Sequence, residues 1–113
     1  MIKQAKTLEN TKLSFKNANI SNYSDLNKYD VIVSCRCFIN QTSSKNQLKL
    51  FQILHSLLKK NGHLIIAEAS VEGLKNLNSL RKSFGLDPIE EHWFNLHLKE
   101  KLIFPKISNI FEI

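Results

Sequence analysis

Two short hydrophobic runs, separated by about the length of one helix, predict a strand, a helix and a second strand. The first run, Val31-Ile32-Val33, is continuous and β-branched, which is typical of a parallel strand buried on both faces. The second run covers residues 64–67 and ends at Glu68. This order predicts a βαβ unit, which is right-handed in nearly all known proteins.

The segment between the two runs has the pattern of an amphipathic helix. Ser44 is predicted as its N-cap, with Gln47 at the third helical position in a capping box. Gly62 is predicted to end the helix in a left-handed conformation. One helical stripe carries the apolar residues, which are Leu50, Phe51, Leu54, Leu57 and Leu58.

Weaker patterns predict an element at each side of this unit. Residues 2–8 carry apolar side chains three apart and predict a short helix, while residues 13–15 alternate and predict a short strand. A second amphipathic helix is expected before Gly85. Its inward-facing residues would be Leu74, Leu77, Leu80 and Phe84.

The last part of the chain has more than one reading. Asn78 and Arg81 share a helical face and either reach a pocket or stay at the surface. Residues 92–97 predict a short strand or a lid, in which Trp93 is either a core residue or a substrate contact. Residues 99–103 predict one helical turn that Pro105 ends, and residues 110–113 predict the start of a strand.

Composition places the chain among single globular domains. Its 113 residues are 42% hydrophobic and include seven Phe, so a core is expected rather than disorder. The net charge of +6 favours anionic partners, but the lysines are scattered and disfavour a nucleic-acid interface. No apolar run approaches the roughly 18 residues of a membrane span, and no signal segment is seen, so a cytoplasmic location without membrane contact is expected.

Polar residues crowd together just beyond the first predicted strand. Ser34, Cys35, Arg36 and Asn40 follow the Val31-Ile32-Val33 run. In open α/β sheets ligands bind outside the carboxyl ends of the strands, so this edge is the predicted site. There the guanidinium of Arg36 could bind a carboxylate of a cofactor or substrate.

The cysteines allow a rival reading as a metal site. Cys35 and Cys37 alternate across one strand end, which is poor disulfide geometry, so both are expected as reduced thiols. With His92 and His97 they could supply four zinc ligands, but the spacing matches no ordinary zinc finger. A cysteine nucleophile lacks a recognisable His or Asp signature around it. We therefore expect no metal site.

The order of these segments resembles class I S-adenosylmethionine-dependent methyltransferases of the small-molecule type. The segments that carry the likeness are residues 29–40, 57–68, 73–81 and 93–96. The resemblance implies an α/β fold with a partial Rossmann-like, mostly parallel sheet flanked by helices. It also implies a single incomplete methyltransferase-like domain over residues 1–113, S-adenosylmethionine as cofactor, and a small molecule or side group as methyl acceptor.

Site residues can be assigned by this resemblance together with the strand-end position. The predicted cofactor contacts are Asn19 and Ile20 at the adenine, with Ser34, Cys35 and Arg36 at the methionine part. The predicted substrate contacts are Arg36, Asn40, Glu68, Trp93 and Asn95. His97 is a candidate general base, because an imidazole titrates near neutral pH.

The chain also departs from the family pattern. Its three glycines, Gly62, Gly73 and Gly85, form no G-x-G cluster, and the resemblance places Met1 after the strands that carry the glycine-rich turn and the ribose carboxylate. If residues 13–15 are the third strand of the family, two strands are missing beside Val31-Ile32-Val33, a gap of roughly 10–15 Å. A fragment or split methyltransferase subunit, completed by a second chain, is the first hypothesis. The alternative is an inactive partial fold that acts as an interaction module or is a relic.

Overall fold

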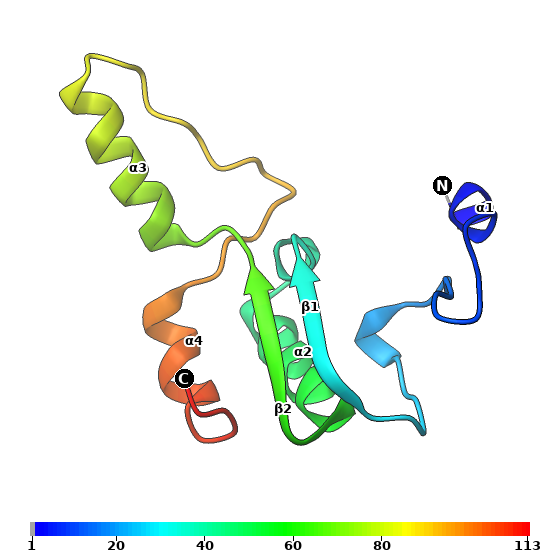
Figure 1. Cartoon of the computed structure of the whole chain (residues 1–113). Helices are drawn as coiled ribbons and strands as arrows, with labels where there is room; N and C mark the ends of the chain where they lie inside the picture. The colour runs from blue at the N-terminus through cyan, green and yellow to red at the C-terminus, as the bar shows by residue number, and fades with distance from the viewer. Residues whose placement is uncertain (1) are drawn as a thin grey trace.

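A computed structural model of the chain describes residues 2–113 and has mixed α/β architecture. Strand β1 (Tyr29–Cys35) pairs in parallel with strand β2 (Leu58–Ala67), and helix α2 (Ser44–Leu57) connects them. The predicted strand–helix–strand order is thus confirmed. Figure 1 shows α2 behind the two strands, which run side by side in the same direction.

Four further elements lie outside this unit. They are the helices α1 (Ile2–Lys6), α3 (Val71–Ser83) and α4 (Glu100–Ile107), and the 3-10 turn η1 (Ile20–Asn22); a second 3-10 turn, η2 (Phe38–Asn40), follows β1. In Figure 1, α1 and α3 stand away from the sheet at opposite sides of the molecule. The radius of gyration is 16.8 Å, against about 13 Å for a compact chain of this length. The described residues therefore form a small core with long extensions.

The core lies on one side of the sheet only. It is built from residues of α2 and α4 with contributions from η2 and the segment before α4: Phe38, Leu50, Phe51, Leu54, Leu98, Ile103 and Ile107. Ile32, Leu64 and Ile66 pack against this cluster from the sheet. The rings of Phe38 and Phe51 lie 4.4 Å apart, centroid to centroid. This packing fixes α2 against β1 and β2.

The opposite face of the sheet is open. Val31, Val33 and Ile65 are 51%, 68% and 55% exposed. The prediction of a strand buried on both faces is therefore wrong for β1, because helices cover only the face that carries Ile32 and Ser34. Side chains alternate between the two faces of a strand, so burying one set leaves the other in solvent.

Helix α2 begins one residue before the predicted start and ends five residues before Gly62, the predicted stop. Ser43, not Ser44, is the N-cap, and its hydroxyl accepts a hydrogen bond from Asn46 N. The helix ends at Leu57, and Leu58 already belongs to β2. Gly62 therefore lies within a strand instead of ending a helix, while Asn61 takes the positive φ of 64°. Gly62 is needed there for space, because an added Cβ would lie 3.0 Å from Tyr29 O.

The predicted short strand at residues 13–15 is wrong. Leu13 forms only an isolated bridge with Asn10, so this segment adds no strand to the sheet. A run of three residues carries too little side-chain area to hold a strand without a neighbouring edge to pair with. The N-terminal helix is confirmed, although it ends at Lys6.

Helix α3 is confirmed as a helix but not as a buried one. None of its residues is buried, and Leu77, Leu80 and the following Phe84 are 44%, 57% and 72% exposed. The inward orientation predicted for its apolar stripe is therefore wrong, because no element of residues 2–113 covers that stripe. Gly85 follows with a φ of +68°, as predicted for a residue that ends a helix.

The C-terminal predictions also need correction. Helix α4 continues through Pro105 to Ile107, so Pro105 does not end it. Residues 110–113 are not a strand: a turn covers residues 108–110, and Phe111 then lies with its ring 6.3 Å from that of Phe51. Residues 92–97 are not a strand either, which leaves the lid as the remaining alternative for this segment.

Candidate functional site

The carboxyl ends of β1 and β2 meet at one edge of the sheet, where they frame a shallow cavity of about 510 Å³. Five of the residues predicted from sequence line it. They are Cys35, Arg36, Glu68, Asn95 and His97, together with Ile39, Ala67 and Ala69. Residues 60 positions apart in the chain are therefore brought together, as the rule on strand ends predicts.

Arg36 has the most unusual backbone of this site. Its φ is +51°, a left-handed conformation that is uncommon for residues other than glycine. Two hydrogen bonds hold it there: Arg36 N donates to Ala67 O at 3.0 Å, and Asn40 Nδ2 donates to Arg36 O at 2.8 Å. The guanidinium has no hydrogen-bond or ion-pair partner among residues 2–113. It is therefore free to bind an anionic ligand group.

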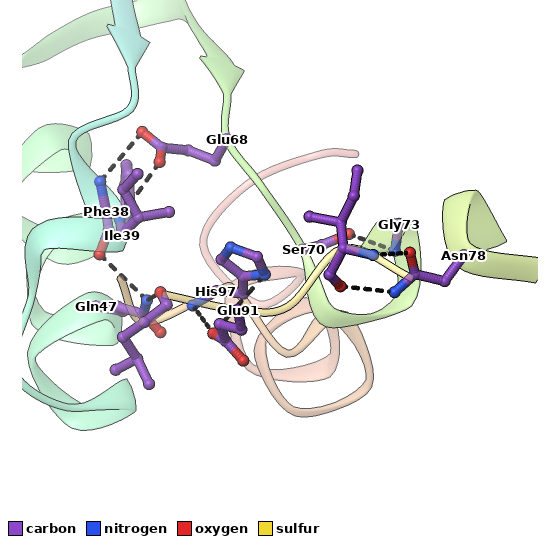
Figure 2. A network of polar contacts seen from close by, with 11 residues as sticks. Phe38, Ile39, Gln47, Glu68, Ser70, Gly73, Asn78, Glu91 and His97 are labelled. Carbon is purple, nitrogen blue, oxygen red and sulfur yellow. Dashed lines mark hydrogen bonds and ion pairs between the residues drawn. The ribbon is translucent and has the colours of Figure 1, made fainter. Parts of the chain in front are cut away.

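Glu68 is engaged with the protein backbone. Its carboxylate accepts a hydrogen bond from Cys37 N. It also accepts from Phe38 N at 3.1 Å and from Ile39 N at 3.3 Å (Figure 2). These are the amide groups at the start of η2, which have no partner within the turn. Glu68 thus fixes η2 to the end of β2, and this is its clearest role in the structure.

Gln47 is a residue of this region that sequence reasoning assigned only to a helix cap. It is fully buried, and its Nε2 donates to Phe38 O at 3.2 Å and to Leu96 O at 2.8 Å. Leu96 N in turn donates to Ile39 O at 2.8 Å. Gln47 therefore ties the segment of Asn95 and His97 to η2. Its position on the same helical stripe as Leu50 and Leu54 was the one sign in the sequence that Gln47 is buried.

His97 lies at the inner side of the same segment. Its backbone N donates to a Glu91 carboxylate oxygen at 2.8 Å, and its Nδ1 lies 3.7 Å from that oxygen. Nδ1 is buried and has no hydrogen-bond partner among the described residues. Figure 2 shows His97 directly beside the carboxylate of Glu91. Glu91 was not predicted, and its distance of six residues from His97 gives no periodic signal.

The remaining predicted site residues lie elsewhere. Ser34 is buried on the helix-covered face of β1, where its hydroxyl is unpaired among residues 2–113. Asn19 caps η1 by accepting from Ser21 N at 2.9 Å, and Ile20 packs against the core. Trp93 is 94% exposed and belongs neither to the core cluster nor to the lining of the cavity, so the prediction of a core residue is wrong.

Asn78 and Arg81 do not reach the cavity. Asn78 exchanges two hydrogen bonds of 2.8 Å with the backbone of Ile89, and Arg81 Nε donates to Asp87 O at 2.7 Å. Both residues therefore brace the loop that follows α3. This agrees with the alternative in which they are surface residues.

The two cysteines are free and differ in environment. Cys35 is exposed, while Cys37 is partly buried beside Glu68. Burial, and then the negative charge of Glu68, raise the pKa of the Cys37 thiol. In residues 2–113 no three His, Cys, Asp or Glu side chains come together in a group that could hold a metal ion, so the four residues of the rival zinc reading do not assemble.

Comparisons with known proteins do not identify a family. No protein-family model matches the sequence, and a search of curated proteins finds no similar chain. No helix within residues 2–113 is long and apolar enough to cross a membrane.

Arg36 is the one residue of the site that would suit S-adenosylmethionine, the cofactor implied by the resemblance. The unpaired guanidinium of Arg36 suits the carboxylate of the methionine part, since a fixed cationic fork binds a carboxylate with two hydrogen bonds. The adenine end is not matched, because the amide oxygen of Asn19 is already used by Ser21 N and Ile20 belongs to the core. Other strands would have to provide the nucleotide part of such a site.

Proposed function

We propose that this chain provides the methionine-binding and acceptor side of an S-adenosylmethionine-dependent methyltransferase site. The nucleotide side would come from Rossmann-like strands outside this sequence. The observation that carries the proposal is the cavity at the carboxyl ends of β1 and β2, lined by Arg36, Glu68, Asn95 and His97. The sequence resemblance adds the choice of cofactor.

Each side chain of the cavity has a distinct task in this proposal. Arg36 would bind the methionine carboxylate, and Glu68 would keep η2 in place beside it. Asn95 can donate and accept hydrogen bonds to orient a methyl acceptor. His97 is the group that can take a proton from the acceptor, because its Nδ1 has no hydrogen-bond partner among residues 2–113 and the Glu91 carboxylate, 3.7 Å away, would stabilise the protonated ring. The bound cofactor would supply an activated methyl group, and orientation of the acceptor would supply much of the acceleration.

Calorimetry with S-adenosylmethionine tests this proposal, using the purified chain alone and with the product of a neighbouring gene. Arg36→Asn is the best variant, because Asn tolerates a positive φ and removes only the cation. We expect it to weaken binding about tenfold or more, the usual size of a charge-assisted hydrogen bond. Arg81→Asn is the matched control, since Arg81 is bonded to Asp87 O away from the cavity, and should bind as the parent chain does.

The result that would overturn the proposal is equal affinity in the Arg36→Asn and parent chains, or no binding in either preparation. Binding by the chain alone would support a cofactor pocket within residues 2–113. Binding only with the second chain would support a split enzyme.

A second candidate function, a non-catalytic interaction module, is favoured by the open sheet face. Three neighbouring apolar side chains, Val31, Val33 and Ile65, are each more than half exposed there. Soluble proteins seldom leave such a contiguous face without a partner. Val33→Lys separates the two candidates: it should abolish pairing with a second protein while leaving the Arg36 cavity intact.

A further inference from the structure

The outer edge of β2 lies along an apolar cavity that is separate from the site above. The cavity has a volume of about 960 Å³ and is bounded by β2, α4 and the C-terminal segment. Its apolar walls are formed by Leu64, Ile66, Phe104, Ile107, Ile110 and Phe111. In Figure 1 the C-terminal turn and α4 lie on the side of β2 that faces away from β1.

The backbone at this edge offers unpaired hydrogen-bonding groups. Ala67 O accepts a hydrogen bond from Arg36 N, so the polar groups of Ala67 point towards β1. Backbone groups alternate in direction along a strand, so those of Leu64 and Ile66 point to the outer edge. β1 is the only strand that pairs with β2 within residues 2–113. Such an edge is a template for a further strand.

One lysine without an ion-pair partner lies at the amino end of β2. Lys60 has no such partner among residues 2–113, whereas the ammonium of Lys59 is paired with Asp30 at 2.8 Å, and both lysines line the cavity. Glu112 is the only acidic side chain among the residues of this lining. The whole chain carries +6. An incoming segment with acidic residues would therefore be favoured at this end.

We propose that the outer edge of β2 binds an extended strand of another protein, with alternating apolar residues and acidic residues at its ends. The edge amides of Leu64 and Ile66 would give backbone hydrogen bonds, as in other cases of strand addition. The cavity would receive alternate side chains, and Lys60 would meet the acidic end. This docking does not depend on the proposed methyltransferase function, because it uses the opposite edge of β2 from β1 and none of the Arg36 cavity.

The probe is a labelled synthetic peptide that alternates valine and threonine and carries glutamates at both ends. Fluorescence anisotropy measures its affinity for the full chain, and hydrogen exchange locates it. We expect binding with new protection of the Leu64 and Ile66 amides. The same peptide with lysines at its ends should bind more weakly, and a version with prolines in place of the threonines should not bind, because it lacks alternate amide donors.

Lys60→Glu should weaken binding of the glutamate-ended peptide by about fivefold, the upper range for an exposed ion pair, and should improve binding of the lysine-ended one. Lys82→Glu is the matched control on α3 and should change neither affinity. Phe104→Ser removes an exposed apolar side chain from the wall of the cavity and should weaken the binding of both peptides.

Three outcomes would overturn the proposal. Equal binding of the proline version would mean that the edge amides are not used. Protection confined to β1 would place the strand at the other edge. A concentration-dependent dimer of the free chain that protects Leu64 and Ile66 would assign this edge to a second copy.

Discussion

Replacing Glu68 with Ala should destabilise the link between the two strand ends. The carboxylate accepts hydrogen bonds from three successive amides, Cys37 N, Phe38 N and Ile39 N. Hydrogen bonds to a charged group contribute about 1.5–3 kcal/mol each. The cavity beside Glu68 lets water replace part of this loss, so we expect Glu68→Ala to lower the free energy of unfolding by about 2–3 kcal/mol.

Urea denaturation measures this loss, and two variants serve as comparisons. Glu68→Gln keeps one accepting oxygen and should cost about 1 kcal/mol. Glu90→Ala, an exposed carboxylate with no hydrogen bond among residues 2–113, should stay within about 0.5 kcal/mol of the parent chain. Hydrogen exchange should show faster exchange of the Phe38 and Ile39 amides in Glu68→Ala. If Glu68→Ala and Glu90→Ala have the same stability, the amides of η2 do not depend on Glu68 and our reasoning is wrong.

Four further predictions concern titration and backbone conformation. Iodoacetamide should modify Cys35 before Cys37, because burial raises the pKa of the Cys37 thiol. Mass spectrometry should show that modification of Cys37 needs a higher pH than that of a free thiol. Equal rates of modification at the two cysteines would contradict this. Hydrogen bonds with Tyr23, and then with Asp25, raise the pKa of Tyr29 to about 12. Asp25→Asn should therefore lower this pKa, which an ultraviolet titration measures. Because hydrogen bonds hold the pKa of Asp25 below its usual range, the stabilisation it gives is present above the usual carboxyl pKa and lost as pH falls. This acid-dependent loss in thermal melts should shrink in Asp25→Asn. Gly85→Ala should cost about 1 kcal/mol in urea denaturation, because of the φ of +68°; no cost would contradict that.

The sequence predicted the central unit well because its signals are local and strong. The β-branched run of β1, the stripe of α2 and the second run before Glu68 each specify one element, and the rule on strand ends then placed Arg36 and Glu68 at one cavity. These predictions needed no knowledge of distant contacts. They cover the part of the chain with a continuous core.

Predictions failed where the result depends on what covers a surface. The apolar stripe of α3 and the alternating face of β1 were predicted as buried, but periodicity shows only that residues share a face and not whether a partner lies against it. Pro105 was predicted to end α4, yet α4 continues because Ile103 and Ile107 on either side of it are both buried in the core. The role of Gln47 depends on Leu96, which lies 49 residues away. Local patterns carry no information about such pairs.

The contacts at the base of α3 show how independent this part of the chain is. Val71 N donates to Leu98 O at 2.9 Å, and Leu98 N donates to Ala69 O at 3.0 Å. The chain therefore leaves the core at Ala69 and returns beside the same point at Leu98. Glu72 also accepts from Glu100 N at 3.0 Å and holds the start of α4. Opening residues 73–94 would expose no buried core residue of α3, so this part should unfold locally at little cost. Modularity follows from this: residues 73–94 can be lengthened, shortened or exchanged in evolution or design, provided that Ala69, Glu72 and Leu98 keep the base closed and Leu96 keeps its bonds to Gln47 and Ile39.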